Sequence, residues 1–131
     1  MLEASIPIRT VDIEISPHKW ALLQKQIQYF CDHQKRVICK WLSKRPVFLE
    51  KYIEYNQDKR DKTRRMQFFF CAIDLLKQVR IIDITSHKTI NGKKCFEFLW
   101  KSKCGQEFGV HIREETIDKD KKLFLISTFW T

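Results

Sequence analysis

The sequence predicts an α+β fold in which N-terminal helices pack on one face of a four-stranded antiparallel sheet (meander) in the C-terminal half. Apolar residues recur at helical spacing up to Gln78 and alternate with polar residues after it. Because no helical interval separates the expected strands, they must be antiparallel rather than parts of βαβ units. We expect a single domain over residues 1–131, with an edge strand and helices in 1–78 and the sheet in 79–131.

The composition is that of a folded and basic chain. Apolar residues make up 44% of it, and 25 Lys or Arg against 16 Asp or Glu give a net charge of +9. The longest uncharged apolar run, residues 68–73, is far shorter than the roughly 20 residues of a membrane-spanning helix. Residues 1–8 do not resemble a signal peptide. We therefore expect a cytoplasmic protein without a membrane partner.

Metal and cofactor motifs do not occur in the sequence. The five cysteines are odd in number and never spaced as C-x-x-C, which favours reduced thiols over a disulfide scaffold or a zinc knuckle. No two histidines stand four residues apart, and no carboxylates cluster at metal-ligand spacing. We expect neither a metal nor a cofactor, and neither a nucleoside triphosphatase nor an α/β hydrolase.

The N-terminal half begins with alternating apolar and polar residues over 5–15, the pattern of an edge strand. Ser16 is a favourable N-cap, and Pro17 is a favourable first helical residue. Apolar residues at helical spacing follow, and we expect this helix to continue to about Ser43. A straight helix of that length would span roughly 40 Å, so we expect a kink near Asp32 and His33.

Two more helices are expected before the sheet. Pro46 would start a short one, and residues 66–78 would form one that is buried on most sides. Between them, residues 56–65 hold five basic and two acidic side chains and no apolar one. This segment is a solvated loop or a helix start.

The sheet region predicts strands at residues 80–86, 93–102, 106–114 and 121–130, with Asn91 and Gly92 in a turn. The hairpin of the second and third strands can be placed in register, because a slip of one residue would expose its aromatic side chains. This register pairs Phe98 with Val110 on the face toward the helices. On the opposite face, it pairs Glu97 with His111 and Cys95 with Arg113, with Lys101 further along.

A carboxylate, an imidazole and a guanidinium on one open face suit ribonuclease chemistry. Cleavage through the neighbouring 2′-hydroxyl needs a base, an acid and a cation for the charge on the phosphorane. Glu97 or His111 can transfer the protons, and Arg113 and Lys101 can pair with phosphate oxygens. The alternative is an ordinary polar cross-strand pair on a solvated face.

The last strand has apolar residues on both faces. We expect its bulkier set to face the core, which would bury Thr128 and expose Ser127 beside His111. That set is Phe124, Ile126, Thr128 and Trp130.

The order of elements, the sequence Phe108-Gly-Val-His-Ile-Arg-Glu-Glu and the later Lys122-Leu-Phe-Leu-Ile-Ser-Thr-Phe-Trp resemble the barnase/EndoU/colicin/RelE-like (BECR) ribonuclease superfamily. The resemblance covers about residues 66–131, and many members are bacterial or phage-associated toxins. EndoU-like members carry a hydroxyl residue followed by an aromatic one on the last strand, which Thr128 and Trp130 match, with Ser127 as a rival. Other members place His, Arg or Lys on neighbouring strands, which His111 and Arg113 match.

Basic residues gather before the buried helix, and opposite nucleic-acid phosphates they would release counterions on binding. A solvated helix face is the alternative, and an acidic inhibitor protein would suit the same charge. The leading hypothesis is a metal-independent toxin-type endoribonuclease acting on RNA, in which Ser127 or Thr128 orients the substrate. The alternative is a non-catalytic nucleic-acid-binding or protein-interaction module. The gathered residues are Lys59, Arg60, Lys62, Arg64 and Arg65.

Overall fold

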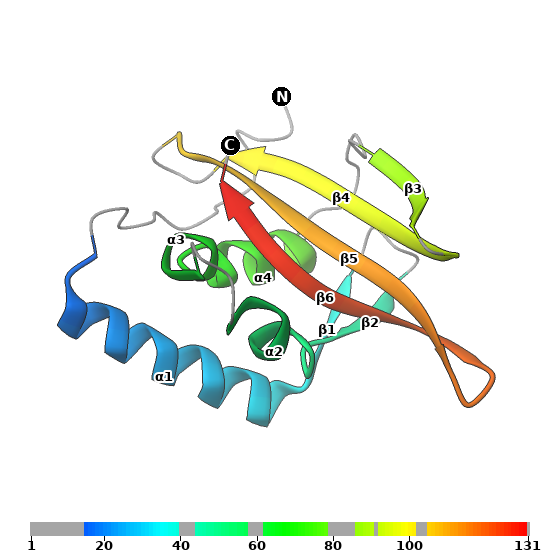
Figure 1. The fold of residues 1–131 in the computed structure, drawn as a ribbon, viewed down its shortest axis with the longest axis horizontal. Coiled ribbons are helices and arrows are strands. Elements are labelled where there is room, and N and C mark those ends of the chain that lie inside the picture. The colour runs from blue at the N-terminus through cyan, green and yellow to red at the C-terminus, as the bar shows by residue number, and fades with distance from the viewer. Residues whose placement is uncertain are drawn as a thin grey trace.

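The computed structural model describes residues 15–39, 44–57, 62–78, 86–90, 92–101 and 105–130. In this part of the chain, helices come first and long strands last (Figure 1). The elements are α1 (Pro17–Gln34), β1 (Arg36–Cys39), β2 (Arg45–Phe48), α2 (Tyr52–Gln57), α3 (Lys62–Met66), α4 (Phe69–Gln78), β3 (Ser86–Ile90), β4 (Lys93–Lys101), β5 (Glu107–Ile117) and β6 (Asp120–Trp130).

The sheet has six strands in the order β1-β2-β6-β5-β4-β3, and it is mixed. Strands β3 to β6 form the predicted antiparallel meander. Strand β2 adds to it in parallel, with Val47 opposite Leu123, and β1 pairs antiparallel with β2. The α+β class and the meander are confirmed, whereas the prediction of a four-stranded, purely antiparallel sheet is wrong.

Helix α1 begins as predicted and ends earlier. The side chain of Ser16 caps it by accepting a hydrogen bond from the backbone N–H of Lys19, at 3.3 Å. The helix stops at Gln34, because Lys35 takes a left-handed conformation with φ of 60°. The predicted continuation to Ser43 is therefore wrong. The chain turns instead into β1, whose residues are alternately exposed and buried.

The segment after β1 also differs from the prediction. Pro46 does not start a helix but lies in β2, opposite Ile38, and the next helix begins only at Tyr52. The predicted buried helix over 66–78 is divided, since α3 ends at Met66 and α4 begins at Phe69. At Pro46 the local pattern indicated a helix, but the pairing of β2 with β1 and with the distant β6 makes this segment a strand.

Two of the expected strands fall partly or wholly on residues that the structure does not describe. The strand expected over 5–15 lies outside the described residues except for Ile15, which belongs to no helix or strand. Residues 80–85 also lie outside them, and β3 runs over Ser86–Ile90 instead, up to the predicted turn. Gly92 in that turn has φ of 79°, a conformation that costs glycine little.

The hairpin of β5 and β6 is longer than predicted. Its turn residues, Asp118 and Lys119, both have positive φ, 51° and 72°, as the type I′ turns that match strand twist require. The two strands pair from this tip as far as Phe108 and Trp130.

The core lies between the helices and one face of the sheet. Figure 1 shows the helices gathered to one side of β6, with β3 at the opposite edge of the sheet. The ring of Phe68, just before α4, stacks there on the ring of Phe108 in β5, with centroids 5.7 Å apart. The sheet contributes Phe98, Phe108, Val110, Ile112, Leu123 and Leu125 to this core.

Helices α2 and α3 lie along the part of β6 that β2 does not reach. The side-chain amide of Asn56 donates to the backbone carbonyl of Ile126 at 2.8 Å. Thr128 donates its hydroxyl to the backbone carbonyl of Arg65. The backbone carbonyl of Ile126, which a neighbouring strand would otherwise satisfy, is thus bonded by a helix.

Candidate functional site

The predicted cross-strand row exists on the face of the sheet that points away from the core, which we call the outer face. Glu97 in β4 stands opposite His111 in β5, as the sequence indicated, and His111 stands opposite Ser127 in β6. All three side chains are partly or largely shielded from solvent. The row therefore places a carboxylate, an imidazole and a hydroxyl side by side on three strands.

A β-bulge interrupts the pairing of β5 with β6 next to this row. The register shifts between His111 and Ile112, so that Ile112 pairs with Leu125 and Ile126 is the extra residue. Thr128 and Leu125 consequently both face the core, although a regular strand would place positions 125 and 128 on opposite faces. The prediction that Phe124 shares the core face with Thr128 is wrong for this reason.

Phe124 lies on the outer face instead, where it pairs with Arg113. It is fully buried there. The ring of Phe48 lies 5.9 Å away between centroids, and the ammonium of Lys51 lies 4.4 Å above the Phe124 ring. The outer face near β2 is therefore covered and is not a bare sheet surface.

Thr128 is separated from the outer face. It is fully buried, and its hydroxyl oxygen lies 2.7 Å from that of Tyr52. Burial raises the pKa of Tyr52 well above its ordinary value, although the hydrogen bond with Thr128 acts the other way. Of the two hydroxyl residues that the sequence offered, Ser127 is the one beside His111.

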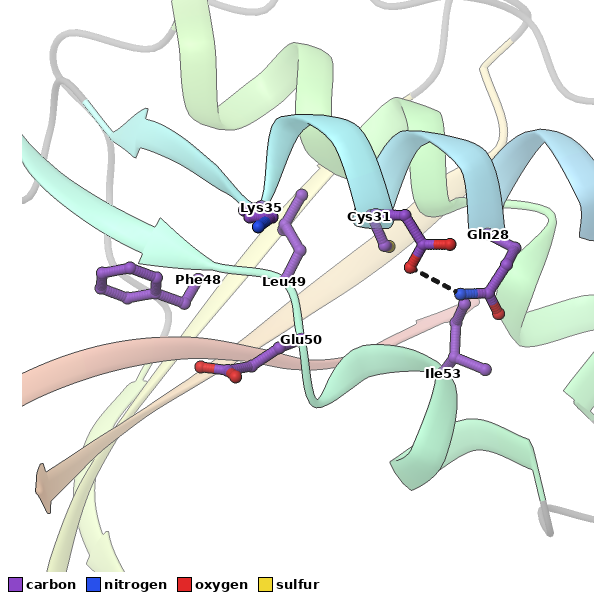
Figure 2. Close-up of a pocket in the computed structure, with 8 residues that line it drawn as sticks. Gln28, Cys31, Lys35, Phe48, Leu49, Glu50 and Ile53 are labelled. Atoms are coloured by element: carbon purple, nitrogen blue, oxygen red, sulfur yellow. Dashed lines mark hydrogen bonds between the residues drawn. The ribbon is translucent and has the colours of Figure 1, made fainter.

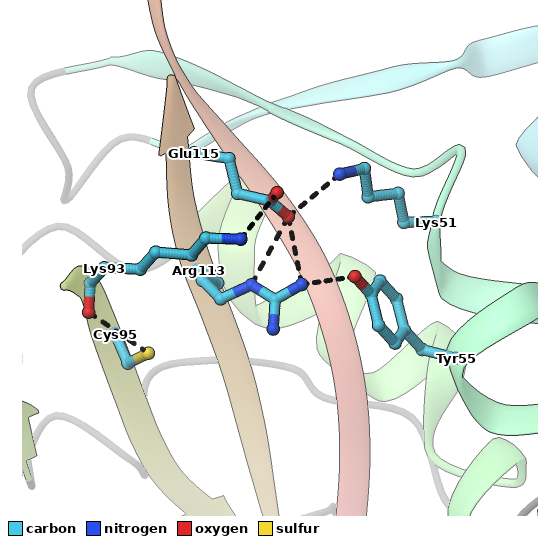
Figure 3. Close-up of polar contacts among 6 residues, drawn as sticks. All are labelled: Lys51, Tyr55, Lys93, Cys95, Arg113 and Glu115. Carbon is cyan, nitrogen blue, oxygen red and sulfur yellow. Dashed lines mark hydrogen bonds and ion pairs between the residues drawn. The ribbon is translucent and has the colours of Figure 1, made fainter. Parts of the chain in front are cut away.

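Arg113 lies two residues along β5 from His111 and is held by a cluster of polar groups (Figure 3). Its guanidinium donates to Glu115 through Nε at 3.3 Å and Nη2 at 3.0 Å, and also to the hydroxyl of Tyr55. Glu115 accepts from the ammonium of Lys51 at 2.9 Å and from that of Lys93 at 3.2 Å. One carboxylate thus serves three cations.

The electrostatics of the cluster follow from these contacts. Partial burial acts to raise the pKa of Glu115, but hydrogen bonds from Lys51, Arg113 and Lys93 outweigh it and lower that pKa to about 2. Desolvation acts to lower the pKa of Arg113, yet the bonds and charges of Glu115 and Tyr55 raise it. Both groups stay charged at neutral pH.

The predicted nucleic-acid-binding residues lie in two places. Lys62, Arg64 and Arg65 belong to α3, which contacts the edge of β6. Lys101 is exposed at the end of β4, opposite Glu107. Lys59 and Arg60 lie outside the described residues.

Sequence reasoning missed Lys51, Tyr55, Lys93 and Glu115. Extending the predicted hairpin register by two more pairs would have placed Lys93 across from Glu115 on the outer face. Lys51 and Tyr55 had no such signal, because local pattern does not show which distant strand α2 and the residue before it contact.

A pocket of about 420 Å³ lies elsewhere, between the end of α1 and the segment from β2 to α2 (Figure 2). The side-chain amide of Gln28 donates to Asp32 at its rim, at 2.9 Å. None of the residues predicted for the site lines it. Its lining consists of Gln28, Cys31, Asp32, Lys35, Phe48, Leu49, Glu50 and Ile53.

Comparison with protein-family models, curated proteins and solved structures finds no match to this chain. Over the described ranges, no helix combines the length and apolarity needed to cross a membrane. No group of three or more His, Cys, Asp or Glu in those ranges is arranged to hold a metal ion.

Proposed function

We propose that the protein is a metal-independent endoribonuclease of the toxin type that uses the outer face of its sheet. The single observation that carries this proposal is the row of Glu97, His111 and Ser127 across three strands, with Arg113 two residues further along β5. Such a row holds an acid/base pair, a hydroxyl and a cation on neighbouring strands of one face. The resemblance to BECR ribonucleases supports the same chemistry.

The reaction requires two proton transfers. Glu97 or His111 accepts the proton of the 2′-hydroxyl, whose oxygen forms a bond to phosphorus, and the other donates a proton to the departing 5′ oxygen. The products are a 2′,3′-cyclic phosphate and a 5′-hydroxyl. Arg113 and Lys101 offset the charge on the phosphoryl oxygens, and Ser127 orients the substrate. The substrate is RNA in the cytoplasm, a compartment that keeps thiols reduced.

A second function of a different class is favoured by one specific observation. Arg113 is already paired with Glu115 and Tyr55, and Nε2 of His111 is shielded from solvent. Proton transfer at that nitrogen requires the ring to turn toward the substrate. A basic module that binds RNA or an acidic inhibitor protein without cleavage would need no such movement.

The deciding experiment is incubation of the purified protein with total cellular RNA in EDTA, followed by gel analysis and end-group chemistry. The ribonuclease proposal expects discrete fragments with 2′,3′-cyclic phosphate ends. His111→Ala and Arg113→Ala should each abolish them while remaining folded. Intact RNA with salt-sensitive binding would favour the binding module.

Matched control variants are available on exposed parts of the chain. His18→Ala removes an exposed imidazole in the first turn of α1, and Arg36→Ala removes an exposed guanidinium at the start of β1. Both should cleave like the unmodified protein. Equal losses in the controls and in the site variants would contradict the assignment of the outer face.

A further inference from the structure

Three cationic side chains from separate segments converge on the carboxylate of Glu115 (Figure 3). Lys51 precedes α2, Lys93 begins β4 and Arg113 lies in β5, so the fold rather than sequence proximity brings them together. Three positive charges against one carboxylate leave the cluster with a surplus of two. A surplus held in one place raises the local concentration of anions.

Glu115 does not accept a hydrogen bond from every N–H group of this cluster. Arg113 uses Nε and Nη2 toward Glu115 and Nη2 toward Tyr55, and within the described ranges its Nη1 meets no acceptor. Each lysine ammonium carries three N–H groups. The side chain of Lys93 is 44% exposed and that of Lys51 is 26% exposed, so an anion from solvent can reach both.

We propose that Lys51, Lys93 and Arg113 form a binding subsite for a phosphodiester of the RNA backbone, in which Glu115 competes for the same donors. The inference deepens the proposed function and rests on it for the choice of RNA as the ligand. Carboxylate and phosphate oxygens accept the same fork of N–H groups from arginine. The subsite shares the outer face with His111, so a strand held here passes the catalytic row.

Competition between Glu115 and phosphate predicts the direction in which a Glu115 variant changes the affinity for RNA. A carboxylate that lies away from the bound strand can be removed with little effect on RNA affinity, because salt screens distant charges. A carboxylate that occupies donors needed by phosphate must be displaced or shared when RNA binds, so its removal strengthens binding. Glu115→Gln should therefore bind RNA more tightly, although it weakens the contacts of the free protein.

The probe is a single-stranded, fluorescein-labelled 2′-O-methyl RNA without terminal phosphates, which lacks the hydroxyl needed for cleavage. Its affinity is measured by anisotropy between about 50 and 200 mM KCl. Lys51→Gln and Lys93→Gln should each lower the log–log salt slope by roughly 0.7, the value for one contact to a single strand. Glu115→Gln should bind roughly fivefold more tightly at the lowest salt, the effect of one unit charge about 4 Å away in water.

Two controls match these variants in charge. Lys25→Gln removes an exposed cation from α1. Glu114→Gln removes the carboxylate next in sequence to Glu115, which pairs with Arg45 on the other side of β5. Neither should change the salt slope or the affinity as the site variants do.

Binding by folded Glu115→Gln that equals or falls below that of the unmodified protein would overturn the proposal. If that variant does not fold, Lys93→Gln decides, because binding like that of Lys25→Gln overturns it as well. Failure of the proposed function is separate. If the unmodified protein does not cleave RNA but its variants bind RNA as expected, the ribonuclease proposal is wrong and the subsite stands. If the protein cleaves RNA but the variants do not show this binding, the subsite is wrong and the ribonuclease proposal stands.

Discussion

The hydroxyl oxygens of Tyr52 and Thr128 lie 2.7 Å apart in a part of the core that solvent does not reach. Thr128 donates its proton to the carbonyl of Arg65, so Tyr52 must be the donor to Thr128. Thr128→Val strands two partners and should lower the free energy of unfolding by about 1–3 kcal/mol. Tyr52→Phe strands none and should cost less. Urea unfolding of both variants checks this order, and an equal or reversed cost would contradict the hydrogen-bond directions.

The close approach of Phe129 to Gly109 predicts a steric effect on the outer face. A Cβ atom at Gly109 would lie 2.0 Å from the Phe129 ring, so the ring must leave its place. Gly109→Ala should lower the free energy of unfolding by about 1–3 kcal/mol, as overpacked sites do. In a thermal-unfolding cycle with Phe129→Ala, the double variant should cost less than the sum of the single ones. Strict additivity would show that the ring does not block the site.

The low pKa of Glu115 predicts an acid-sensitive contribution to stability. Its pKa is about 2 in the folded protein against an ordinary 4.5, so the folded state favours the charged form. This contribution is present above pH 4.5 and is lost as the pH falls toward 2. The difference in urea midpoint between the unmodified protein and Glu115→Gln should therefore shrink over that range. A difference that stays constant with pH would show that the charge of Glu115 is not its source.

Cys31 should be unreactive in the folded protein. Burial, together with the nearby charge of Asp32, raises the pKa of its thiol to about 12, so almost no thiolate exists at pH 8. A short pulse of iodoacetamide followed by peptide mapping should label Cys31 only after unfolding in guanidinium. Labelling of the native chain at the rate of the unfolded one would contradict the burial of this thiol.

The sheet hairpin could be predicted from sequence because each of its strands alternates. A slip of one residue would have exposed Phe98 and Val110, and this penalty alone set Glu97 opposite His111. The prediction failed where the deciding contact lies far away in sequence. The run containing Val37 fits a helix or a strand by its apolar content, and β1 exists because β2 pairs with it and with β6.

The candidate site could be predicted only in part for the same reason. The place of Arg113 on the outer face followed from the alternation of β5, but its contact with Tyr55, and that of Lys51 with Glu115, join segments far apart in sequence. The bulge at Ile126 left no local signal in the sequence, since both faces of β6 are apolar there. One extra residue was enough to move Phe124 to the other face.

The parallel pairing of β2 with β6 also bears on how the protein is made. All four described helices, together with β1 and β2, leave the ribosome before β6, which α2, α3 and β2 contact. Until Leu123 and Leu125 emerge, the hydrophobic core to which α1 and α4 contribute lacks part of its sheet. A nascent chain paused before β6 would therefore present the kind of surface that chaperones bind. The N-terminal half has to wait for the last described strand, so the fold closes late in synthesis rather than progressively.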